Sequence, residues 1–133
     1  MKYFTIKELC GSDTADKLRI KNKPTLQDVE RMRELIENVL DPLREAYGKP
    51  IKVNSGFRTK ELNAVLPGAS KTSQHMRGEA ADITVHTKEG NKWLFDYIKN
   101  NLPYDQLINE YDYSWVHVSF TTERTNRQEI KKS

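Results

Sequence analysis

Apolar residues recur at steps of three and four positions along residues 25–47, which is the period of an amphipathic helix. Thr25 precedes them as an N-cap residue three positions before Asp28, and Gly48 and Pro50 follow them as stop signals. The pattern predicts a helix of about five turns with one face in the core. The recurring positions are Leu26, Val29, Met32, Ile36, Val39, Leu40 and Leu43.

Shorter patterns predict the other elements. Residues 51–56 form a β-rich run, residues 59–66 suit a short helix, and residues 80–85 are apolar apart from Asp82 and Thr84, as in a buried strand. Residues 90–101 suit a second amphipathic helix, and residues 104–120 alternate about a polar centre, as in an antiparallel hairpin. These elements predict a small single α+β domain over residues 1–133, with an antiparallel sheet and helices packed on one side.

The polar residues from about 121 onward suggest a tail that frays. The chain of 133 residues suits one domain, which we expect to be a monomer. Its formal charge of +3 comes from 22 basic and 19 acidic residues without a basic stripe, so we expect no nucleic-acid partner and a mild preference for an anionic polymer such as a cell wall. The single cysteine, Cys10, excludes an internal disulfide and a thiolate metal cluster.

The opening residues lack the apolar stretch of a secretory signal, and no later segment approaches the roughly 18 apolar residues of a membrane span. We therefore expect a protein that is cytoplasmic as synthesised, with no membrane span. If the protein works on the outside of a cell, another factor must release or carry it.

Asp82 is an acidic residue on a predicted buried strand, where an unpaired carboxylate would cost several kcal/mol, so a metal, a cation or hydrogen-bond donors must lie nearby. His75 lies in a Gly- and Ser-punctuated loop, and His117 lies on a predicted strand between two valines. Two imidazoles and one carboxylate are the ligand set of an open catalytic zinc site. Residue types alone also allow hydrogen-bonded core histidines. His86 shares the strand alternation of Asp82, but we expect it to face solvent.

Three segments, SGFRTKELN, SQHMRGEAADI and WVHVSF, resemble in order the signature blocks of the M15 family of zinc D-Ala-D-Ala peptidases. The similarity extends from about residue 4 to residue 120 and is strongest to the phage and Bacteroidetes branch of the family. The resemblance implies that His75, Asp82 and His117 bind Zn²⁺ at the sheet.

The same resemblance places Arg58 at the rim of the site, where its planar guanidinium can meet a carboxylate or polarise the scissile carbonyl. Ser73 and Gln74 are expected to hold the histidine or to line the cleft. We expect Arg77 and Glu79 to be solvated loop charges.

The general base is less obvious, because relatives in the family carry a catalytic glutamate three residues before the second histidine ligand, where this chain has Ser114. Serine cannot relay a proton as a carboxylate does. Glu110 is our first candidate, because a hairpin would place it across from residues 115–117 on the next strand. Asp112 is the second candidate.

The resemblance implies a zinc metallopeptidase that hydrolyses an amide next to a D-amino acid in peptidoglycan stem peptides, in cell-wall lysis or remodelling. One example is a phage endolysin, which a phage holin would release to the cell wall. It leaves open which bond is cut. The alternative is a catalytically inactive, metal-bound binding or structural module on the same fold, which Ser114 at the expected glutamate position favours.

Overall fold

The long amphipathic helix forms as three consecutive segments in the computed structural model, which describes residues 1–133. They are α3 (Leu26–Leu35), a π-helical turn η1 (Ile36–Leu40) and α4 (Asp41–Tyr47). Thr25 and Asp28 form the predicted capping box, and Gly48 ends the helix with a φ of 79°. The π-helical turn, unlike the helix, was not predicted. It lies just before Pro42, which has no backbone N–H to donate to the helix.

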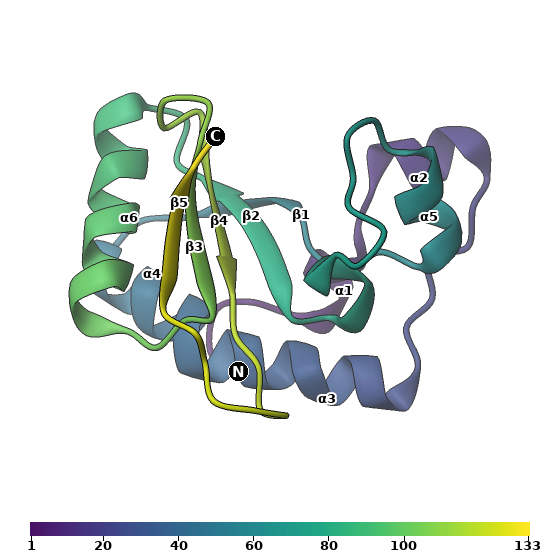
Figure 1. Cartoon of the computed structure of the whole chain (residues 1–133), viewed down its shortest axis with the longest axis horizontal. Coiled ribbons are helices and arrows are strands. Elements are labelled where there is room, and N and C mark those ends of the chain that lie inside the picture. The colour runs from purple at the N-terminus through teal and green to yellow at the C-terminus, as the bar shows by residue number, and fades with distance from the viewer.

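Five strands form one sheet in the order β1-β2-β4-β3-β5 (Figure 1). Its central hairpin, β3 and β4, is the hairpin predicted from the alternating pattern. All neighbouring strands are antiparallel except β3 and β5, which are parallel. The sheet is therefore mixed, whereas the sequence predicted an antiparallel sheet. The strands are β1 (Lys52–Ser55), β2 (Ala80–Thr84), β3 (Gln106–Glu110), β4 (Trp115–Ser119) and β5 (Glu129–Lys132).

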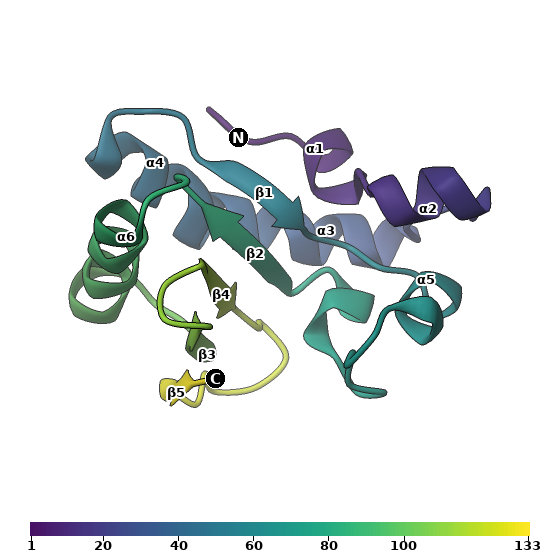
Figure 2. The same cartoon turned by 90° about the horizontal axis from the view of Figure 1, so that it is seen from above.

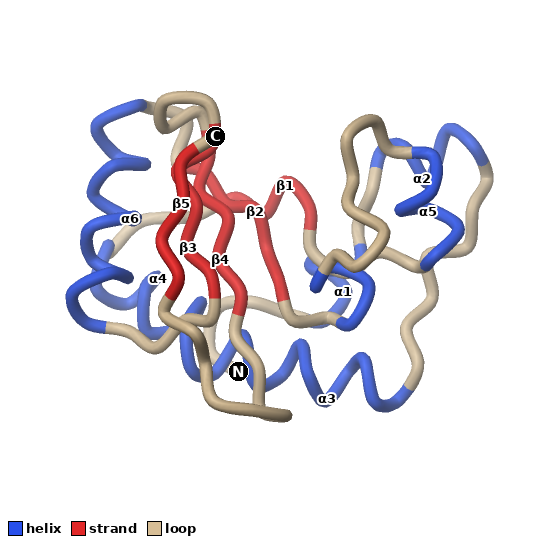
Figure 3. The backbone as a smooth tube through the Cα atoms, in the orientation of Figure 1, coloured by secondary structure: helices blue, strands red, loops and turns tan.

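Helices cover one face of this sheet, as the sequence predicted. Side chains from α3, η1, α4 and α6 (Lys88–Asn101) share one core with alternate residues of β2, β3 and β4. Figures 2 and 3 show α6 beside the sheet, and in Figure 3 α4 passes behind the strands and α3 runs below them. Since side chains alternate along a strand, the intervening residues, among them Asp82 and His117, lie on the opposite face. The sheet residues in the core are Ala81, Ile83, Leu107, Val116 and Val118.

The remaining helices lie at the end of the molecule far from α6 (Figure 1). They are α1 (Ile6–Cys10), α2 (Asp13–Leu18), α5 (Lys60–Val65) and the 3₁₀ turn η2 (Gln74–Arg77). None of the helices is both long enough and apolar enough to cross a membrane.

The segment after residue 121 does not fray, so that expectation was wrong. It folds back along the sheet and adds β5 beside β3. The side chain of Asp105 holds it there: this fully buried carboxylate accepts hydrogen bonds from the Arg124 guanidinium at 2.7 and 2.9 Å and from Arg127 Nη2 at 2.8 Å. Polar residues are thus ordered by a partner that lies about 20 positions earlier, which no local pattern reveals.

Replacing Asp105 with Asn should lower the free energy of unfolding by about 2–3 kcal/mol, because both arginines lose the buried carboxylate while staying half exposed to water. Burial alone would raise the pKa of Asp105, but hydrogen bonds from Arg124 and Arg127 lower it below its ordinary value. The stabilisation is therefore complete above the ordinary carboxyl pKa of about 4 and is lost as the pH falls below it. Urea unfolding at several pH values checks this; a difference that persists unchanged in acid would contradict it.

Candidate metal centre

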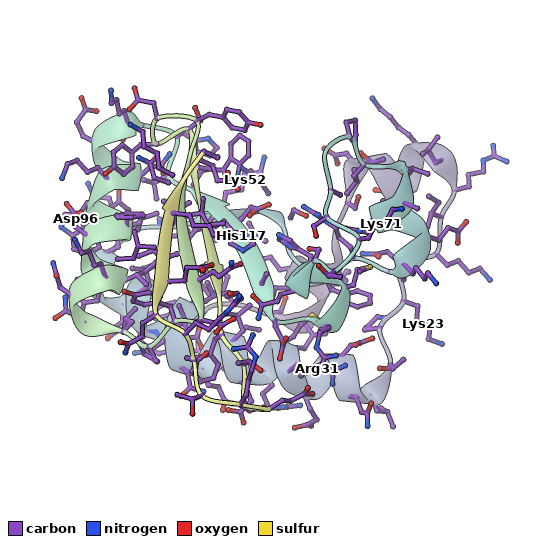
Figure 4. The ribbon with its side chains drawn as sticks, in the orientation of Figure 1. Lys23, Arg31, Lys52, Lys71, Asp96 and His117 are labelled. Atoms are coloured by element: carbon purple, nitrogen blue, oxygen red, sulfur yellow. The ribbon has the colours of Figure 1, made fainter.

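Three side chains with metal-binding atoms meet on the open face of the sheet. Asp82 on β2 is directly opposite His117 on β4, and η2 brings His75 beside them. One ligand atom from each residue lies within 4.8 Å of the others. Figure 4 shows His117 near the middle of the sheet. The structure therefore brings together the three metal ligands predicted from the sequence.

His75 is held by its neighbours in a single orientation. The Ser73 hydroxyl accepts a hydrogen bond from the His75 backbone N–H at 3.1 Å, and His75 Nδ1 donates to the Gly56 carbonyl at 2.7 Å. Because a carbonyl only accepts, the proton lies on Nδ1 and leaves Nε2, which is 3.4 Å from Asp82 Oδ2, as the metal-binding atom. Burial lowers the pKa of His75 below its ordinary value, so the ring is in the neutral form that binds metals.

Two glycines allow the chain to approach closely around this histidine. Gly78 ends η2 with a φ of 77°, and a Cβ there would lie 2.7 Å from the Asp28 carbonyl oxygen of α3. A Cβ on Gly56, whose carbonyl orients His75, would lie 2.4 Å from the carbonyl oxygen of Leu9. Gly78 therefore makes a tight turn that packs closely against α3.

Asp82 and His117 form a close pair, with His117 Nδ1 2.9 Å from Asp82 Oδ1. Burial opposes ionisation of Asp82, but the neighbouring imidazoles of His75 and His117 lower its pKa below its ordinary value. The group is therefore a carboxylate. A carboxylate and two histidine nitrogens are a donor set that suits Zn²⁺, and three protein ligands are the number found in catalytic zinc sites.

Arg58 is fixed beside the cluster and is not a mobile surface residue. Its side chain is 13% exposed, and Nη2 lies 3.5 Å from Asp82 Oδ2. Nε donates to Ser55 Oγ at 2.9 Å, and Nη1 donates to Asn63 Oδ1 at 3.3 Å. Each of the three guanidinium nitrogens therefore has a protein partner. Ser55 and Asn63 both lie within five positions of Arg58, but no pattern in the sequence predicts them as its partners.

A cleft of about 1140 Å³ opens over the cluster. One wall is the loop between α5 and η2, including Ser73, together with Gln74 at the start of η2. The other wall is formed by β3, β5 and the segment that joins β4 to β5. Tyr111 and Trp115, whose ring centroids are 5.2 Å apart, also line it. The three candidate metal-binding residues therefore line an open cleft.

Of the two candidate bases, the structure places only Glu110 in this cleft. Glu110 is opposite Trp115 and accepts a hydrogen bond from Ser133 Oγ. Asp112 is exposed in the turn between β3 and β4, where it pairs with Lys88 at 2.7 Å and lines a separate hollow. His86 lines that same hollow and is exposed, as expected from the sequence.

Glu79 is not the solvated loop charge that we expected. Its residue is 3% exposed, Oε1 accepts from Arg77 Nε at 3.2 Å, and Oε2 has no hydrogen-bond partner. The chain around Glu79 contacts residues at and after the end of β4, since the Phe120 N–H donates to the Glu79 carbonyl and Glu123 pairs with Arg77. Arg77 itself remains about half exposed, as expected.

Comparison with known proteins agrees with this geometry. A family model described as Peptidase M15 matches residues 2–119, so the chain belongs to the M15 peptidase family and the resemblance read from the sequence is confirmed. A zinc D-Ala-D-Ala carboxypeptidase of Streptomyces albus G is 51% identical to this chain over 45 residues, which are 33% of this chain. The match covers 17% of that protein's length.

Proposed function

We propose that this protein is a zinc-dependent metallopeptidase that hydrolyses an amide bond next to a D-amino acid in peptidoglycan stem peptides, as part of cell-wall lysis or remodelling. The observation that carries the proposal is the convergence of His75, Asp82 and His117 at the floor of an open cleft. Membership of the M15 family and the substrate named for the Streptomyces relative support the substrate class.

In this proposal His75, Asp82 and His117 hold the ion. When bound, Zn²⁺ polarises the peptide carbonyl and lowers the pKa of its bound water to about 7. Arg58 lies beside Asp82, where its positive charge stabilises negative charge that develops on the carbonyl oxygen. Ser73 and Gln74 line the same cleft and contact the substrate backbone.

Glu110 is the proposed general base, which takes a proton from the attacking water and returns it to the amine leaving group. The sheet register supports this role. His117 is directly opposite Ile108, so Glu110, two residues farther along β3, is its diagonal neighbour on the same face. Diagonal neighbours have Cα atoms about 7–8 Å apart, which a long side chain can bridge directly or through one water.

The proposal predicts that the zinc-loaded protein shortens purified muropeptides, which mass spectrometry of the digest detects. Protein stripped of metal by a chelator should give no product, and restored zinc should restore it. The product masses also identify which bond is cut. Zinc-loaded protein that binds muropeptides but releases no product would instead support the inactive binding module, which Ser114 at the usual glutamate position favours.

A further inference from the structure

Lys131 on β5 belongs to the row of side chains that contains the metal ligands. Asp82 is opposite His117, His117 is opposite Ile108, and Ile108 is opposite Lys131. Residues in register on neighbouring strands project from the same face of a sheet. Lys131 therefore lies on the open face, two strands from His117, and it lines the cleft.

Lys131 is the least engaged of the cations that line the cleft, where Arg77 pairs with Glu79 and Glu123. Arg124 and Arg127 bind Asp105, and the three nitrogens of Arg58 have protein partners. The one ion pair of Lys131 is with Glu129 at 3.5 Å, and both side chains are substantially exposed, at 54% and 38%. Such a pair contributes little, and an ammonium has three donors, so Lys131 can bind an incoming anion.

The spacing across the sheet defines where that anion would lie. Neighbouring strands are about 4.8 Å apart, so the Cα atoms of His117 and Lys131 are about 10 Å apart. One extended residue spans about 3.5 Å. If the scissile amide lies at the metal ligands and the substrate runs toward β5, the carboxylate of the next residue lies above Ile108, within reach of the Lys131 ammonium. The half-buried Ile108 then presents an apolar surface to a small side chain.

We propose that Lys131 binds the free carboxylate of the residue that follows the cleaved amide. The substrates preferred by the cleft are then stem peptides that end one residue beyond the scissile bond, and Lys131 is a specificity-determining residue. This inference rests on the proposed function. The C-terminal segment then serves substrate binding, because the hydrogen bonds of Asp105 to this segment hold β5 in position beside β3.

Calorimetric titration can test this without turnover, using zinc-loaded protein that carries Glu110→Gln. The two probes are N-acetyl-D-Ala-D-Ala and the same dipeptide with a C-terminal amide. We expect the acid to bind about 10-fold more tightly than the amide, as for a hydrogen bond to a charged group. Adding Lys131→Gln should weaken binding of the acid about 10-fold and leave binding of the amide unchanged.

Lys132→Gln is the matched control, since it removes the same charge from the next residue, whose side chain projects from the opposite face of β5. It should leave the binding of both probes unchanged. The inference is overturned if Lys131→Gln weakens the two probes equally, if Lys132→Gln has the same effect as Lys131→Gln, or if neither probe binds. Failure of the proposed function looks different: protein with Glu110 intact would bind the acid through Lys131 but would not cleave it.

Discussion

Replacing His117 with Ala is expected to reduce zinc affinity by more than about 100-fold while leaving the protein folded. Loss of an outer hydrogen-bond partner of a metal ligand already costs about 10–100-fold in affinity, and this substitution removes one of three ligands outright. The fold should survive, because His117 is on the open face and the apolar core lies on the other side of the sheet. Elemental analysis and competition with a chelating dye would measure the zinc, and circular dichroism would report the fold.

His86→Ala is the matched control for this experiment. It removes an imidazole that is exposed and lines a different hollow, so zinc binding should stay at about one ion per chain. Retention of one tightly bound zinc by the His117 variant would show that other ligands hold the metal. Loss of the folded circular dichroism signal would mean that the site is structural.

The three proposed metal ligands could be predicted mainly from the resemblance to the M15 blocks, because residue types and local patterns alone also allow hydrogen-bonded core histidines. A carboxylate in an apolar strand demands a partner, and the alternation of β4 places His117 on the face opposite its flanking valines. The register that sets Asp82 opposite His117 needed the structure. So did the hydrogen bond from His75 to the Gly56 carbonyl, because the two residues are 19 positions apart and a backbone acceptor has no sequence signature.

The C-terminal segment is where sequence reasoning failed, and the errors share one cause. Polar patterning predicts solvated residues, yet Asp105 binds two arginines from the segment and Glu79 is buried. Ionic contacts between distant segments have no period along the chain, unlike the apolar face of α3 or the alternation of β4. One wall of the cleft was missed for the same reason, because β5 forms that wall and carries Lys131.

The expected position of the catalytic glutamate is occupied by Ser114, which is exposed in the turn and donates its hydroxyl hydrogen to the Tyr111 carbonyl at 2.7 Å. Ser114 therefore has no acidic group to offer to the site. Glu110, on the neighbouring strand, faces the cleft as the diagonal neighbour of His117. A carboxylate supplied from β3 can perform the same proton transfer as one supplied from the turn, because the task depends on distance and pKa and not on sequence position.

Glu110→Gln should accordingly lower the rate of hydrolysis at saturating substrate by about 100-fold to 10,000-fold, the range lost when a general base is removed. Zinc binding should not change, since glutamine keeps the size of the side chain and Glu110 is not one of the metal ligands. Single-turnover kinetics with a muropeptide substrate, measured from about pH 5 to 9, would separate the chemical step from substrate binding.

Asp112→Asn is the control for this substitution. It also converts a carboxylate to an amide, but Asp112 lies in the turn between β3 and β4 and outside the cleft. Asp112 pairs with Lys88 at the surface, so its loss should leave the rate within a few-fold of wild type, as for other surface pairs. A full rate for Glu110→Gln together with a collapsed rate for Asp112→Asn would transfer the role of base to Asp112. Equal, large losses in both variants would indicate instead that the turn between β3 and β4 must keep its conformation for β4 to hold His117 in place.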